Sequence, residues 1–169
     1  MAKSKQLCAP RADKLDRWFR ILQIILFCMP FVYLAYLRIG TGGASLDDPG
    51  VLSGNPAMAV ALLAALLQPY VGWLLVLSQR RLADGRTAYA VLNLTLLLIA
   101  ELMTMSSIGV VGLGLILFKT IRTCGMGPSA AWRAANKTQL FAECGGSVLM
   151  CLLAGLCLFA TMRLGGLPL

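Results

Sequence analysis

The longest apolar run in the chain extends from Ala88 to Phe118 and contains one charged residue, Glu101. Such a run is stable in lipid rather than in water, because about 18 or more consecutive apolar residues are typical of a membrane-spanning helix. Three further apolar runs cover residues 21–37, 56–77 and 140–162. The chain is therefore predicted to be an all-α integral membrane protein, since a helix satisfies its backbone hydrogen bonds within the bilayer.

The amino-acid composition agrees with this prediction. Hydrophobic residues make up 59% of the chain and charged residues 13%, compared with about 45–50% and about 25% in soluble domains. A β-barrel is disfavoured because the runs are apolar throughout and do not alternate in polarity. With 169 residues, the chain is predicted to form a single membrane domain, a small polytopic helical bundle.

The run over residues 88–118 is too long for one upright helix. A straight helix of this length would extend ~46 Å, and ~30 Å of hydrocarbon would require a tilt near ~50°, outside the usual range of about 0–40°. It would also separate two basic segments that should lie on the same side. We therefore predict a break at Met105–Gly109, with spans over residues 88–104 and 106–121. Five spans follow, or four if the run is one long helix.

The basic residues lie mainly in three segments, which five spans place on one side: the amino terminus, residues 79–87 and residues 119–139. Positively charged loops are typical of the cytoplasmic side, so the amino terminus is predicted to be cytoplasmic. Residues 1–20 are predicted to form a basic interfacial arm, in which Leu15, Trp18, Phe19 and Leu22 recur at helical spacing. The net charge of +8 reflects this topology, and no nucleic-acid partner is expected.

Two prolines lie within the predicted spans. Pro30 predicts a kink in the first span, and Gln68-Pro69 predicts an interruption near the middle of the second. The segment over residues 128–137 is interpreted as a surface helix with Trp132 at the membrane interface.

Four polar residues form a candidate polar intramembrane site: Gln68, Asn93, Glu101 and Thr104. The last three share one helix face by their spacing, and Gln68 and Gln23 are expected to meet that face. Such residues either join helices by hydrogen bonds or line a path for an ion or solute. In the predicted hairpin, Glu101 lies one turn from the outer end, where its carboxylate is expected to reach water.

Small residues in the last two predicted spans let helix backbones approach closely. The candidate helix-packing residues are Gly109, Gly112, Gly114, Gly145, Gly146 and Gly155. The first three have the spacing G-x-x-G-x-G, which resembles a nucleotide-binding loop. No strand precedes them and their surroundings are apolar, so a dinucleotide site is not expected.

Residues suited to catalysis or metal binding do not form a readable set. The six cysteines include no C-x-x-C pair and the chain has no histidine, so a zinc site would need an all-thiolate assembly. No nucleophile–base pair or carboxylate pair can be read from the spacing. The chain is therefore not expected to be an enzyme or to bind a cofactor.

The expected function is that of an accessory, assembly or regulatory subunit acting through helix–helix interactions. Its expected partners are the lipid bilayer and other membrane proteins or a second copy of the chain. The alternative is a small-solute or ion transporter, or the membrane component of one, using Gln68, Asn93 and Glu101. A transporter should enclose a water-accessible cavity reaching Gln68 and Asn93, whereas an accessory subunit should pack them against neighbouring helices.

Overall fold

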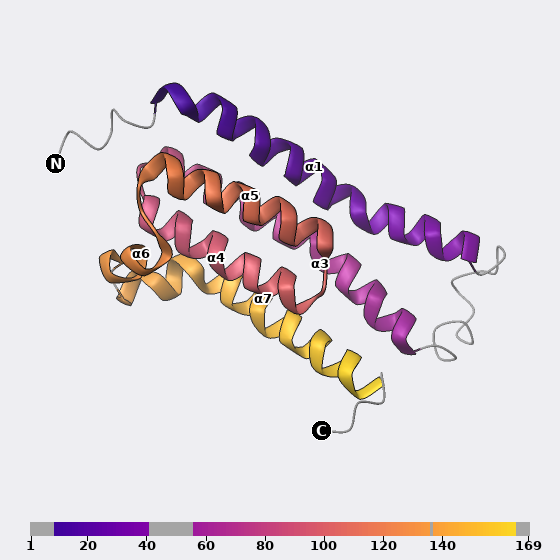
Figure 1. Cartoon of the computed structure of the whole chain (residues 1–169). Coiled ribbons are helices and arrows are strands. Elements are labelled where there is room, and N and C mark those ends of the chain that lie inside the picture. Colours follow the sequence, from indigo (N-terminus) through magenta and orange to yellow (C-terminus); the bar gives the residue numbers. More distant parts are fainter. Residues whose placement is uncertain (1–8, 41–55, 136, 165–169) are drawn as a thin grey trace.

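A computed structural model describes residues 9–40, 56–135 and 137–164. Within these ranges the chain is helical and has no strand, which confirms the predicted all-α class. The long helices lie side by side in a bundle, and a short helix covers one end (Figure 1). The helices are α1 (Ala9–Gly40), α3 (Pro56–Ala83), α4 (Thr87–Met103), α5 (Ser107–Cys124), α6 (Pro128–Ala134) and α7 (Lys137–Leu164). The polar loop after Gly40 lies outside the described residues.

Four helices are long and apolar enough to cross a membrane, judged by length and composition. Among the described residues, the qualifying segments are Leu15–Ile39, Met58–Ala83, Ser107–Cys124 and Cys144–Arg163. Helix α4 is also apolar but has only 17 residues. At a rise of about 1.5 Å per residue it is about 25 Å long, at the lower limit of a spanning segment.

The predicted break in the long apolar run is present between α4 and α5. Met105 has a left-handed backbone with φ 55°. The N–H of Met105 donates to Leu102 O at 3.2 Å, and the N–H of Ser106 donates to Glu101 O at 3.2 Å. These two bonds form a Schellman motif, the arrangement that commonly ends a helix. Ser106 is the N-cap of α5, because its hydroxyl accepts the N–H of Gly109 at 3.4 Å.

Helix α1 does not divide at residue 20 into an arm and a span. It is continuous from Ala9 to Gly40, so residues 9–20 of the predicted arm and the first predicted span form one helix, while residues 1–8 lie outside the described part. Leu15, Phe19 and Leu22 are buried together with Leu26. This apolar stripe continues through the expected boundary, and helix propagation is favourable where one face is packed along its whole length.

Neither internal proline interrupts its helix. Pro30 lies inside α1 and Pro69 lies inside α3, so the interruption expected at Gln68-Pro69 is absent. A proline removes one helical hydrogen bond, which neighbouring helices in a membrane bundle can compensate by packing. In α3 the missing donor is the one that would bond the carbonyl of Ala65.

Helix α4 occupies the centre of the bundle. It contacts α3, α5, α6 and α7, whereas α1 lies against α3 and α5. Its buried residues cover most of its circumference: Ala90, Val91, Leu92, Asn93, Leu94, Leu97, Ala100 and Glu101. A helix surrounded by others is apolar on all sides because each side meets protein. The polar residues that α4 carries are therefore held inside the bundle.

One end of the bundle, here named the basic end, holds the start of α1, the α3–α4 turn, the end of α5 and α6 (Figure 1). Its basic residues include Arg17, Arg20, Arg80, Arg81, Arg86, Lys119, Arg122 and Arg133. The Lys119 ammonium lies 4.3 Å from the centroid of the Trp18 ring, which joins α5 to α1 by a cation–π contact. The α4–α5 turn lies at the opposite end, here named the turn end (Figure 1).

Candidate functional site

Glu101 lies inside the bundle, in the last turn of α4. Its side chain is 0% exposed and that of Gln68, on α3, is 3% exposed. Gln68 Nε2 donates to Glu101 Oε2 at 3.2 Å. The expectation that this carboxylate reaches water is therefore wrong, because neighbouring helices cover it.

Gly109 provides the space that the Glu101 carboxyl occupies. A Cβ atom built at residue 109 would overlap the Glu101 carboxyl group. Gly109 stands on the first turn of α5, and the short turn after α4 brings that position back beside residue 101. The hairpin thus covers the carboxyl on one side, and α3 covers it on the other through Gln68.

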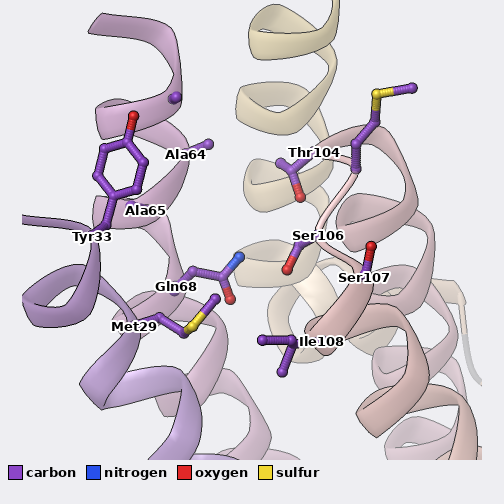
Figure 2. A pocket seen from close by; sticks show the side chains of 11 residues that line it. Met29, Tyr33, Ala64, Ala65, Gln68, Thr104, Ser106, Ser107 and Ile108 are labelled. Carbon is purple, nitrogen blue, oxygen red and sulfur yellow. The ribbon is translucent and has the colours of Figure 1, made fainter. Parts of the chain in front are cut away.

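A cleft of about 400 Å³ adjoins this pair at the turn end. Figure 2 shows Gln68 reaching toward Ser106 and Ile108, with Met29 and Tyr33 of α1 flanking it. The remaining lining residues are Ala61, Ala64, Ala65, Thr104, Met105 and Ser107. The cleft therefore has apolar walls from α1 and α3 and a polar side made by the α4–α5 turn.

Thr104 lies at the cleft, but its hydroxyl is already used within its own helix. Thr104 Oγ1 donates to the carbonyl oxygen of Glu101 at 3.1 Å. Of the four candidate polar residues, the structure thus brings Gln68, Glu101 and Thr104 together.

Asn93 lies away from this group in a separate polar cluster. Eight residues separate it from Glu101, which is about 12 Å along a helix. Its amide donates to Ser78 Oγ and, at 3.4 Å, to Leu74 O, and its carbonyl accepts the hydroxyl of Ser147. Asn93 is 1% exposed. Its hydrogen bonds join α4 to α3 and α7, which is the packed arrangement and not the lining of a cavity.

Gln23 does not meet the candidate polar face, so that expectation is wrong. Gln23 Nε2 donates to Gln79 Oε1 at 3.0 Å, and Gln79 Nε2 donates to Asp16 Oδ1 at 2.8 Å. Asp16 and Gln23 are seven residues apart, so they share one face of α1. These two hydrogen bonds join α1 to α3 near the basic end.

The six candidate packing glycines divide into two groups. A Cβ added to Gly112 would overlap Leu22, one added to Gly146 would press on Leu74 at 2.8 Å, and Gly155 approaches Met103 Sδ at 4.0 Å. Gly109 packs on Glu101 as described. By contrast, Gly114 and Gly145 have nothing within 4 Å of an added Cβ. Four of the six therefore pack inside the bundle, and two leave open space.

Sequence reasoning did not identify the serines that complete the two polar groups. Ser106 lines the cleft beside Gln68, and Ser78 and Ser147 hold Asn93. A signal existed for Ser78, which follows Gln68 at a spacing of ten residues on a run that is otherwise apolar. Its partner could not be read from the sequence, because contact depends on the relative rotation of α3 and α4.

The described residues include no group of three or more His, Cys, Asp or Glu side chains that could hold a metal ion. A second hollow, of about 240 Å³, lies between α4, α6 and α7 and is lined by Leu92, Thr95, Leu96, Pro128, Trp132 and Cys144. Comparisons with protein families, with curated proteins and with solved structures find no match to this chain.

Proposed function

We propose that the chain crosses the membrane five times, through α1, α3, α4, α5 and α7, with its amino terminus in the cytoplasm. The support is the central position of α4 between longer apolar helices, and the collection of basic residues at one end of the bundle. Positive charge beside spanning helices is typical of the cytoplasmic side. The short α4 then crosses the membrane surrounded by the other helices of the bundle.

We infer that this protein is a non-enzymatic accessory, assembly or regulatory subunit that acts through helix–helix contacts with other membrane proteins or a second copy. One observation carries this proposal: the Asn93 side chain is fully hydrogen-bonded to α3 and α7. The polar groups of this cluster therefore join helices. The outward surface at the same time is apolar, with Phe31, Val111 and Leu152 among its exposed side chains. Gly114 and Gly145 leave gaps in that surface where another helix can approach closely.

The test is purification from the native membrane with a mild detergent, followed by identification of the proteins that accompany the wild-type chain. The variants Gly114→Leu and Gly145→Leu fill the two open positions and should reduce recovery of the partner several-fold. They should leave the fold intact, because nothing within the bundle lies against these positions.

A matched control is Val111→Leu, which changes an exposed apolar residue on α5 without filling a glycine position. It should leave partner recovery unchanged. Equal recovery with wild type and both glycine variants would contradict a helix-docking role at these positions. A wild-type chain that purifies as a single monomer would contradict the accessory function as a whole.

The transporter alternative is favoured by the cleft at Gln68, beside the buried Glu101. It is opposed by the saturated hydrogen bonds of Asn93 and by the continuity of α3 through Pro69. Solute sites in transporters are typically built from interrupted helices near the bilayer midplane. Reconstituted vesicles separate the two functions: an ion or solute flux that Glu101→Gln abolishes would favour the transporter.

A further inference from the structure

The cleft at the turn end has the size and lining of a small-ligand site. Its volume of about 400 Å³ lies within the range of about 300–1,000 Å³ that is usual for such sites. Most of its wall is apolar, formed by Met29, Ala61, Ala64 and Ile108. Its polar groups include Gln68 on α3 and, across the cleft, Thr104, Ser106 and Ser107 at the α4–α5 turn (Figure 2).

The Gln68–Glu101 pair, of which Gln68 lines the cleft, leaves two buried oxygens without hydrogen-bond donors. Gln68 Oε1 and Glu101 Oε1 have no hydrogen-bond partner among the described residues. Both side chains are more than nine-tenths buried, at 3% and 0% exposed. A buried acceptor without a donor is costly, and natural sites of this kind are commonly completed by a bound group.

The orientation of the Gln68 amide determines what kind of group fits. Its Nε2 donates to Glu101, so its Oε1 is left as an acceptor. The Glu101 carboxyl stands one hydrogen bond behind Gln68, and a cation bound at Gln68 Oε1 favours the ionised form of that carboxyl. No Lys or Arg is among the residues that line the cleft. A ligand that donates hydrogen bonds and carries positive charge therefore complements this side.

The same face of α3 that carries Gln68 suits an apolar body on its preceding turns. Three alanines of α3 leave the space open, and the Tyr33 ring of α1 stands beside it (Figure 2). An aromatic face also attracts cations. An inorganic ion would use the Gln68 side of the cleft and leave the apolar wall without a partner.

We propose that this cleft binds a small organic cation, a protonated primary amine with a short apolar chain. The ammonium group lies at Gln68 Oε1 with Glu101 as its counter-charge, and the chain lies between Met29 and Ala64. The proposal goes beyond the accessory function and does not depend on it.

The test uses the full-length protein in nanodiscs of zwitterionic phosphatidylcholine, with ¹³C-labelled methionine methyl groups observed by NMR. Met29 and Met105 line the cleft, while Met150 is buried elsewhere and Met162 is exposed near the end of α7. Hexylammonium chloride is the probe, and hexanol and sodium chloride are titrated in parallel. The expected result is a saturable shift of the Met29 and Met105 signals, with Met150 and Met162 unchanged.

Hexanol should need at least about tenfold higher concentration for the same shift, since it lacks the charge that Glu101 attracts. Glu101→Gln keeps an acceptor for Gln68 and should weaken hexylammonium binding by about tenfold or more. Asp84→Asn is the matched control, because it removes a carboxylate that is exposed at the basic end. It should leave binding unchanged. Ala64→Phe fills the cleft without touching the charge and should abolish the shift.

Three results would overturn the proposal. Equal binding of hexanol and hexylammonium would show that charge has no role. An unchanged affinity of the folded Glu101→Gln variant for hexylammonium would show that Glu101 does not act as the counter-charge. A cleft-specific shift produced by sodium chloride at lower concentration than by hexylammonium would assign the cleft to an inorganic cation. If Glu101→Gln fails to fold, the hexanol comparison and Ala64→Phe decide the outcome.

Discussion

At the scale of single residues, Glu101 and Gly109 depend on each other. The carboxyl occupies the volume that any side chain at residue 109 would need. Gly109 is therefore required at this position by the neighbouring helix, although glycine is an unfavourable residue within a helix. A residue other than glycine should be tolerated at position 109 when the Glu101 carboxyl is absent.

We expect Gly109→Ala to destabilise the protein by about 1–3 kcal/mol, because the added methyl group overpacks the site. In a Glu101→Ala background the same change should be nearly neutral. Unfolding in mixed micelles with increasing denaturing detergent measures the four corners of this double-mutant cycle. Gly114→Ala is the control, and it should be neutral or stabilising since its surroundings are open. Additive effects of Gly109→Ala and Glu101→Ala would contradict the contact.

Replacing Asn93 should loosen the centre of the bundle. Asn93→Leu removes its bonds to Ser78 and Ser147 and leaves those buried hydroxyls with fewer partners. The expected loss is about 1–3 kcal/mol of unfolding free energy, measured by the same denaturing-detergent titration. Thr95→Val serves as the control, because Thr95 Oγ1 bonds only Val91 O of its own helix, at 2.8 Å. A smaller loss for Asn93→Leu than for Thr95→Val would contradict the joining role.

The sequence identifies the polar residues of the interior more readily than their partners. Gln68, Asn93 and Glu101 are visible because they interrupt apolar runs, which makes them expensive in lipid. Their partners depend on how each helix is rotated, and helical spacing gives only positions on the same helix. The spacing of Asp16 and Gln23 could have indicated one shared face of α1, but not that Gln79 lies opposite.

At the scale of elements, the α4–α5 turn is the feature on which the site depends. Chain length and charge predict a break in the long apolar run, and the break occurs between Thr104 and Ser106. They do not predict that a methionine takes the left-handed position of the Schellman motif, which glycine usually occupies. Ser106 carries a local signal, since serine is favoured at the N-cap, the residue immediately before a helix.

We expect Met105→Gly to stabilise the hairpin by about 1 kcal/mol, because glycine adopts positive φ without the steric cost of a side chain. Met105 is 77% exposed, so little packing is lost. Met105→Val should destabilise it, since a β-branched residue is poorly tolerated at positive φ. Thermal unfolding in detergent checks both variants. A lower midpoint for the glycine variant than for wild type would contradict the left-handed turn.

At the scale of the whole molecule, the distribution of basic residues sets the orientation that we propose. The start of α1 contacts the end of α5 through Lys119 and Trp18, and it contacts the end of α3 through the hydrogen bond from Gln79 to Asp16. The sequence predicts that the basic residues lie at one end of the bundle, because the positive-inside tendency acts on whole loops. That prediction does not require the side-chain contacts to be known.

Cys124, at the end of α5, should be inaccessible to a membrane-impermeant thiol reagent in intact cells and labelled once the cells are opened. The variant to use retains Cys124 as its only cysteine. A matched variant carries its only cysteine in place of Ile39, which is exposed at the other end of α1, and it should be labelled in intact cells. The reverse pattern would contradict the cytoplasmic position of the amino terminus.

The burial of the Glu101 carboxyl by α3 and α5 affects how the chain is inserted into the membrane during synthesis. Gln68 is synthesised before the carboxylate, but Ser106 and Gly109 follow it within eight residues. We therefore expect α4 and α5 to leave the translocon together as a hairpin, with the charge shielded between its arms. A nascent chain that ends at Met103 should integrate α4 less efficiently than one that ends at Cys124, as measured by glycosylation mapping. Glu101→Leu should abolish that difference.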